Sequence, residues 1–488
     1  MVLEKIFSII QKYCDRLSKF IKNNKNTVFI FASIASIFIA IILSYLNEDG
    51  FMLLPAAIIP IFCITIFYNI FTASKNYKKA MAYSFIISAL FQIYLAAQFI
   101  GVEHDINVQY NAAVVFERNG DVYSEVNPYY STPIYKKITA FYRPDKQSTA
   151  NIIDYYGHPS RIYLSYFAYK ISKLTNLPFS FLVKIPMIIS TLLIAFMIYK
   201  ILMLSKMSYR GIYLALAFYL FNPVVIMVSG YHGQVDNLGI FFLILFLFYI
   251  LKRKKTNLFL DLIFGCSLVL KPVTAATIPY FLLQRKKFAR MLKFLIAASI
   301  PFLFLLIFYK HINFHNTLKF VILYNGVNYL WSYSRIEQYL TTLLNLPALH
   351  GAFKYVYPAI TILMFSIIFY YFYRNSKIKP LDGIILSYLF FYSLNSGFGV
   401  QYLLWILPFA VIKATESNQF RYFLFVFSFL SGFLCLIFYY GNANRYFFMR
   451  DVIGYSIMGI SLWLFIIYWL LWYINIGVKI KATQKPIA

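Results

Sequence analysis

The chain has 488 residues, is 61% hydrophobic and only 13% charged, and has a mean hydropathy of +0.67. A soluble domain of this size does not bury so much apolar material, so the composition predicts a membrane protein whose spans are runs of roughly 20 apolar residues. The net charge of +28 comes from basic clusters beside apolar segments, and no separate basic domain supports nucleic-acid binding.

The first residues and the apolar segments after them define the predicted organisation. Residues 1–26 carry apolar and basic side chains at helical spacing, which predicts an interfacial helix on an anionic inner leaflet; a solvated basic leader is the alternative. Residues 27–475 form one predicted transmembrane domain, and 476–488 form a cytoplasmic tail. The predicted spans, fourteen in all, lie at 27–46, 52–72, 80–101, 178–203, 211–229, 237–251, 258–270, 272–283, 291–309, 354–373, 381–396, 398–412, 420–439 and 453–475.

Basic clusters set the predicted orientation. Lys and Arg gather at alternate connections, for example at 75–79, 252–255 and 285–290, which places these connections and both termini in the cytoplasm. Two long polar segments, 102–177 and 310–353, then lie outside, and the stretch RIYLSYFAYKISKL in the first predicts a helix along the membrane surface. We expect an all-α polytopic membrane protein of about 14 transmembrane helices, with membrane-surface helices in its extracytoplasmic first loop.

A lysine interrupts one apolar region. The segments on either side of Lys271-Pro272 are too short to cross comfortably, because thirteen helical residues rise about 20 Å against a hydrocarbon core of roughly 30 Å. Pro272 breaks the helix. A lysine within or near the end of a membrane segment suggests a functional role, and a snorkelling side chain is the alternative.

Four short polar stretches follow or precede apolar segments at the predicted outer face. A solvated helix cap is the alternative for the stretch that contains Asp105. An ordinary turn is the alternative for the stretch that contains His232, Gln234, Asp236 and Asn237. Together they supply a candidate general base, amide and imidazole groups, and a cation, which suits displacement of a phosphate leaving group from a sugar carbon. The candidate site residues in these stretches are Asp105, Tyr110, His232, Gln234, Asp236, Asn237, Lys271, Gln401 and Tyr402.

Four sequence elements in order resemble a known family. They are HDINVQYNAAVVFERNGDVY, GYHGQVDNLGIFFLIL, FGCSLVLKPVTAATIPYFLL and GFGVQYLLWILPFAV. They resemble the GT-C superfamily of polyprenyl-phosphate-sugar-dependent integral membrane glycosyltransferases. Within it the chain looks like the bacterial mannosyltransferase-type branch, glycosyltransferase family 87-like, and like the eukaryotic GPI mannosyltransferase I. The resemblance covers roughly residues 100–415.

The resemblance implies an inverting glycosyltransferase that moves a hexose, mannose first, from a polyprenyl phosphate to a lipid-linked glycan, glycolipid or envelope polymer. It implies Asp105 as the general base, with Asp236 as the alternative base to test. Asp236, Gln234 and Asn237 would orient sugar hydroxyls or hold the first loop. The candidates that would stabilise the departing phosphate are Lys271 first, then His232, Arg161 and Arg335, and the family match at His158 is partial.

The expected enzyme needs no cofactor, since a lysine can replace a metal at the phosphate; a divalent ion held by Asp105 and Asp236 is the less favoured version. Its partners would be the bilayer, the donor lipid and the acceptor glycan. Two other functions fit parts of the pattern: a flippase for a lipid-linked oligosaccharide, and an envelope polysaccharide polymerase or ligase with a diphosphate-linked donor. The bacterial cytoplasmic membrane and the endoplasmic reticulum both suit the pattern.

Overall fold

The structure, a computed structural model, describes residues 76–118, 122, 159–253, 257–308, 332–344, 347–375, 377–395, 399–443 and 449–483. Within these ranges every regular element is a helix, as the hydropathy pattern predicts. The predicted leader and the first two predicted spans lie outside the described residues. Contacts divide the chain into two compact units, Met1–Ala80 and Met81–Ala488, and the second contains nearly all of the described helices.

Five described helices are long and apolar enough to cross a membrane, and a sixth span results if one bent pair is counted as a single crossing. This is the architecture of a helical membrane protein. Four of the five are α4 (Tyr77–Gln98), α7 (Phe179–Leu204), α13 (Phe288–Phe308) and α19 (Asn418–Ala443). The fifth candidate span, Ile453–Asn475, runs from the π-helix η6 (Met449–Gly459) into α20 (Ile460–Thr483).

Further helices accompany these five. The predicted segment 258–270 coincides with one of them, α11. The set comprises α5 (Glu103–Glu117), α6 (Pro159–Thr175), α10 (Asp236–Arg253), α11 (Leu258–Leu270), η4 (Pro272–Thr277), α12 (Ile278–Leu283), α15 (Tyr333–Leu343), α16 (Pro347–Arg374), α17 (Pro380–Leu394), η5 (Val400–Leu404) and α18 (Leu407–Ala414).

The predicted span at 211–229 is broken, and the break changes the direction of its second half. It consists of α8 (Tyr209–Leu220), α9 (Pro223–Ile226) and the π-helix η3 (Met227–His232), with a bend of 50°. Asn222 causes the break, since its side chain accepts a hydrogen bond from the Val224 N–H at 3.0 Å and Pro223 begins the new helix. The chain therefore restarts in a new direction and continues to His232.

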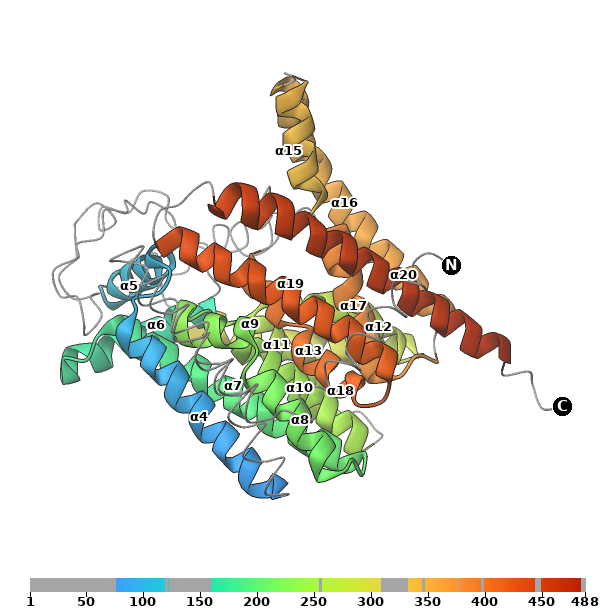
Figure 1. The fold of residues 1–488 in the computed structure, drawn as a ribbon, viewed down its shortest axis with the longest axis horizontal. Helices are drawn as coiled ribbons and strands as arrows, with labels where there is room; N and C mark the ends of the chain where they lie inside the picture. Colours follow the sequence, from blue (N-terminus) through green and yellow to red (C-terminus); the bar gives the residue numbers. More distant parts are fainter. Residues whose placement is uncertain are drawn as a thin grey trace, which may run out of the picture. The chain divides into compact units, whose positions relative to one another are not determined.

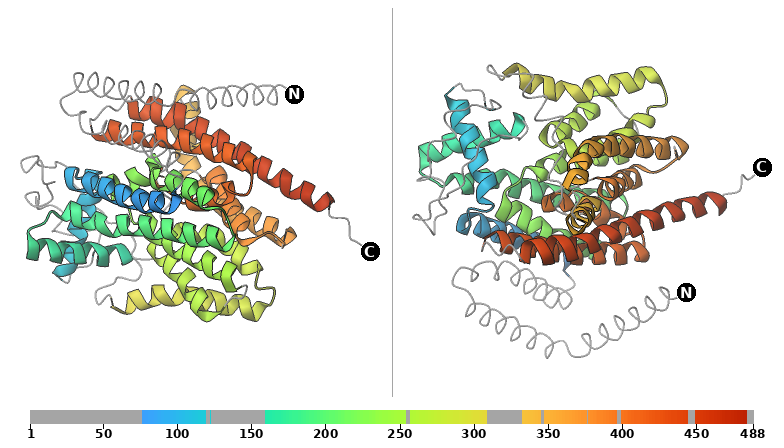
Figure 2. Two further views of the ribbon diagram at one scale, coloured as in Figure 1. Left: turned by 60° about the horizontal axis from the view of Figure 1, so that its bottom comes forward. Right: turned by 90° about the horizontal axis from the view of Figure 1, so that it is seen from above.

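Packing places the ends of several helices together. α10 lies against α7 and α11, α11 lies against α13, and α6 contacts both α5 and α7 (Figure 2). α19 runs alongside α20 and also contacts α9 and η5 (Figure 1). α5 follows directly after α4, and α10 follows directly after η3. The polar stretches that contain Asp105 and Asp236 therefore lie at the ends of helices that belong to one packed group.

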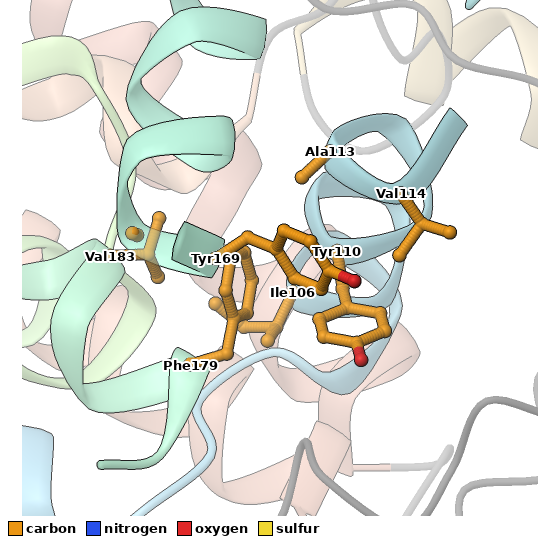
Figure 3. Close-up of a cluster of buried hydrophobic side chains, with 8 residues drawn as sticks. Ile106, Tyr110, Ala113, Val114, Tyr169, Phe179 and Val183 are labelled. Atoms are coloured by element: carbon orange, nitrogen blue, oxygen red, sulfur yellow. The ribbon is translucent and has the colours of Figure 1, made fainter. Parts of the chain in front are cut away.

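A buried aromatic cluster joins α5 to α6 and α7 (Figure 3). The Tyr110 ring meets the rings of Tyr169 and Phe179 edge-on, with centroids 5.5 and 5.2 Å away. Ile106 and Val183 complete the packing. Edge-to-face aromatic pairs are worth about 0.5–1.5 kcal/mol each beyond their area burial. Burial raises the pKa of Tyr110 to about 12, so its phenol stays neutral inside this cluster.

An ionic contact fastens the far end of the same helix pair. Glu117 at the end of α5 pairs with Lys170 at 2.6 Å and Lys173 at 3.2 Å, both on α6. Burial acts to raise the pKa of Glu117, but hydrogen bonds from Lys170, Tyr169 and Lys173 outweigh it and lower this pKa to about 2. α5 is thus held at both ends, by apolar packing and by charge.

Candidate functional site

Three polar side chains from two distant segments meet at one point. Asp105, in the first turn of α5, lies with its Oδ2 2.6 Å from Nε2 of His232, the last residue of η3. The Gln234 side-chain amide donates to the same carboxylate oxygen, and its nitrogen lies 3.0 Å from His232 Nε2. A carboxylate whose orientation is fixed by an imidazole and an amide is able to act as a positioned proton acceptor.

The turn that carries His232 and Gln234 depends on Gly233. Its φ of +75° is left-handed, which favours glycine, and it ends the π-helix η3. A Cβ at this position would lie 2.7 Å from Cγ of Lys184 on α7. No larger residue fits there without displacing Lys184. π-Helical turns are frequent at functional sites, and this one aims two site side chains.

Lys184 ties the two halves of this site together. Its ammonium donates to the Phe99 carbonyl at 2.6 Å, just after α4 ends. Gly101, with a φ of +97°, lies so close to the Tyr231 carbonyl that a Cβ there would collide with it. The backbone before Asp105 therefore packs on the backbone before His232, and the Lys184 side chain lies beside this contact.

His232 has a second partner on its other ring nitrogen. Nδ1 lies 2.7 Å from the hydroxyl of Tyr439 on α19, and both side chains are buried. The two rings also meet edge-on, with centroids 5.3 Å apart. The imidazole is therefore clamped between a carboxylate and a phenol.

A second constellation surrounds Asp236, the first residue of α10. Its Oδ1 accepts a hydrogen bond from Trp405 Nε1 at 2.6 Å, and its Oδ2 lies 3.5 Å from Lys271 Nζ. The Lys271 ammonium also lies 5.2 Å from the centre of the Tyr402 ring, which stacks on Trp405 at 4.1 Å. Asp236 is fully buried, so these contacts compensate a charge that would otherwise be costly there.

Arg161 connects the two constellations electrostatically. It lies on α6 near enough to Lys271 for the two positive charges to repel, while Asp105 and Asp236 both attract Lys271. The Nε and Nη2 atoms of Arg161 are buried and have no hydrogen-bond partner within the described part of the chain. The same holds for the buried Oε1 of Gln234. Leaving a buried donor or acceptor without a partner is costly, so these atoms of Arg161 and Gln234 are able to hydrogen-bond a bound group.

Other predicted site residues lie elsewhere. Asn237 donates to Thr191 at 2.6 Å and to Ser229, so it joins α10 to α7 and η3 inside the core. Tyr110 belongs to the aromatic cluster described above, and packing explains its position. Their proposed part in substrate binding stays a prediction.

Arg335, Gln401 and His158 complete the predicted set. Arg335 on α15 donates to Gln338 at 2.8 Å and to Ser456. Gln401 lies in η5 beside Tyr402, with its amide folded against Gly399. His158 lies outside the described residues.

Three residues of this region were not predicted from sequence. Tyr439 lies inside an apolar segment where tyrosine is common and carries no local signal. Lys184 does carry a signal, because placing a lysine inside an apolar segment costs free energy, as it does at Lys271. Trp405 lies in the element GFGVQYLLWILPFAV, from which only Gln401 and Tyr402 were named as candidates.

The arrangement combines a carboxylate oriented by two neighbours with two cations and unpaired polar atoms. It can accept a proton at Asp105 and can stabilise an anion near Lys271 and Arg161. Within the described residues no group of three or more His, Cys, Asp and Glu side chains could hold a metal ion. Comparison with protein-family models, with characterised proteins and with solved structures gives no significant match.

Proposed function

We propose that this protein is an inverting glycosyltransferase of the membrane, which transfers a hexose from a polyprenyl monophosphate to a hydroxyl of a lipid-linked glycan, glycolipid or envelope polymer. Mannose is the first hexose to test, because the sequence resembles mannosyltransferases. The observation that carries the proposal is Asp105, held by His232 and Gln234 near two partly buried cations, Lys271 and Arg161.

Asp105 is the proposed general base. The acceptor oxygen attacks the anomeric carbon, its proton passes to the carboxylate, and the bond from that carbon to the phosphate oxygen breaks. His232 and Gln234 support this role because both hold Oδ2, which fixes the orientation of the carboxylate. The electron pair of the broken bond remains on the phosphate oxygen. The acceptor attacks from the face opposite the phosphate, which inverts the configuration at the anomeric carbon.

Lys271 and Arg161 are the proposed partners of the phosphate, whose negative charge grows as the bond breaks. The unpaired Nε and Nη2 of Arg161 supply donors suited to phosphate oxygens, and Lys271 adds a second positive charge nearby. No metal is needed in this scheme. Asp236 is a poor metal ligand here because Trp405 occupies one carboxylate oxygen and Lys271 lies beside the other.

The proposed topology has about 14 spans, cytoplasmic termini and an active site on the outer face. The ends of the described helices support it. α4 begins next to Lys78 and Lys79 and ends near the site, whereas α10 begins at Asp236 and ends at Lys252 and Arg253. The site therefore lies at the ends opposite to the basic ends, as the positive-inside rule requires of an external site.

The test is transfer by purified protein in proteoliposomes, with radiolabelled polyprenyl-monophosphate and polyprenyl-diphosphate sugars supplied in parallel. We expect transfer from the monophosphate, retained in excess EDTA. The matched control is Glu416→Gln, because Glu416 pairs only with Lys413 among its described ion pairs and is half exposed. Transfer from the diphosphate donor alone would identify a polymerase or ligase, and lipid movement without transfer would identify a flippase.

A further inference from the structure

Tyr439 holds a position that the proposed chemistry has not used. It lies in α19, 207 residues from His232 in sequence, and its hydroxyl is 2.7 Å from His232 Nδ1. The phenol is fully buried, and its ring also packs edge-on against Tyr231, with centroids 5.3 Å apart. Packing alone would be satisfied by phenylalanine, so the hydroxyl is the informative atom.

The hydrogen bonds on the other side of the ring define what this hydroxyl must do. A neutral imidazole has one N–H and one bare nitrogen. His232 Nε2 faces an Asp105 oxygen at 2.6 Å, so Nε2 must carry the proton when the carboxylate is ionised. Nδ1 is then the bare nitrogen, and it must accept a hydrogen bond from Tyr439.

A hydroxyl suits both protonation states of this imidazole. When His232 is neutral, the Tyr439 O–H donates to Nδ1. When His232 is protonated, Nδ1–H donates to the Tyr439 oxygen, because a hydroxyl group both donates and accepts. A backbone carbonyl at this position would accept only, and would favour the opposite tautomer.

We propose that Tyr439 is a positioning residue that donates to Nδ1 of His232 and so supports, in tautomer and ring orientation, the imidazole whose N–H is directed at Asp105. This inference rests on the proposed function for its kinetic consequence, although the tautomer itself does not. The titratable and charged groups near the His232–Tyr439 pair include Asp105 from α5, Cys435 from α19, Tyr231 from η3, Asp236 from α10 and Lys184 from α7.

The test compares Tyr439→Phe with Tyr219→Phe. Tyr219 is also fully buried, and its hydroxyl has no hydrogen-bond partner in the described part of the chain. Both variants remove one buried oxygen and keep the ring. Both should fold, because removing a hydroxyl without changing side-chain shape is a mild change.

Two measurements separate a tautomer role from a merely structural one. The first is the ¹⁵N spectrum of protein labelled at its six histidines, with His232→Gln identifying the resonances of His232. We expect wild type and Tyr219→Phe to show a protonated Nε2 and a bare Nδ1. In Tyr439→Phe the Nδ1 signal should move further from the protonated position, because a bare nitrogen that loses its hydrogen-bond donor stays bare while Asp105 still holds the proton on Nε2.

The second measurement is steady-state transfer. Tyr439→Phe should lower kcat about tenfold, the size of one hydrogen bond, and leave KM for the donor unchanged. An unchanged His232 spectrum in Tyr439→Phe would overturn the inference, and so would an unchanged kcat. If no variant transfers sugar, the proposed glycosyl transfer fails, and the spectrum alone then decides the role of Tyr439.

Discussion

Asp105 and His232 are 127 residues apart in the chain, yet Oδ2 of one lies 2.6 Å from Nε2 of the other. Asp105 stands in the first turn of α5, and His232 ends a π-helix that follows a break in its own span. This pair is the centre of the site, because Gln234 and Tyr439 also bond to it.

Replacing the carboxylate tests the base directly. Asp105→Asn keeps the shape and lets the side chain remain beside His232, but it cannot accept a proton. We expect turnover to fall by about 10²–10⁴-fold, the usual contribution of a positioned base. Binding of the donor, measured by equilibrium binding of labelled lipid, should change little. Near-normal transfer by this variant would remove Asp105 from the mechanism.

Arg161 offers a test in which function and stability should separate. Because Nε and Nη2 are buried without partners, Arg161→Gln should leave the melting temperature equal to or above that of wild type. It should nevertheless weaken donor turnover by about ten- to a hundredfold in kcat/KM, because charge-assisted bonds to phosphate are lost.

Arg335→Gln is the matched control for this change. Arg335 was also a candidate for phosphate, but it donates to Gln338 and Ser456. We expect transfer by Arg335→Gln to match wild type. A larger loss in Arg335→Gln than in Arg161→Gln would assign the phosphate to the other arginine.

Gly233→Ala tests the turn between His232 and Gln234. Alanine at a φ of +75° is strained by about 1–3 kcal/mol, and its Cβ would meet Lys184 at 2.7 Å. We expect a lower melting temperature and slower transfer. Gly211→Ala is the control, because Gly211 is helical and its nearest neighbour is the flexible end of Met207. Equal effects of the two changes would argue against strain at the turn.

Trp405→Phe removes the indole donor to Asp236 and keeps an aromatic ring. A buried carboxylate oxygen then loses its hydrogen bond, which costs about 1–3 kcal/mol and more for a charged group. Trp463→Phe is the comparison, since Trp463 donates to the neutral Ser393 carbonyl at 3.1 Å. Chemical denaturation should show the larger loss for Trp405→Phe, and the reverse order would contradict a charged Asp236.

The contact between α5 and α6 should depend on pH. The pKa of Glu117 is lowered from 4.5 to about 2, so the folded state favours the ionised carboxylate. Its contribution to stability is fully present above pH 4.5 and is lost as the pH falls toward 2. The amount should be below about 1 kcal/mol, because Lys170 and Lys173 are each nearly half exposed.

The measurement is the difference in melting temperature between wild type and Glu117→Gln across this pH range. We expect wild type to be more stable near neutral pH and the two curves to converge as the pH approaches 2. High salt should shrink the difference. A gap that widens on acidification would show that the carboxylate is not stabilising.

Local signals in the sequence were enough to predict most of the described helices. The apolar runs at 178–203 and 258–270 match α7 and α11 to within a residue, because an unbroken apolar run in a membrane must satisfy its backbone hydrogen bonds as helix. The break at Asn222-Pro223 was missed, although an N-cap followed by proline is a readable start signal. Hydropathy also did not predict α5, whose residues are only weakly apolar.

The sequence by itself determined that this is a helical membrane protein and which stretches carry the polar residues, because hydropathy and charge act within single segments. Only the tertiary structure decided which of these residues meet. Asp105 and His232 come together because α4 and η3 end side by side around Lys184, while Asn237, next to Asp236 in sequence, turns into the core. Neighbours along a helix point about 100° apart, so a motif names candidates, and helix packing selects among them.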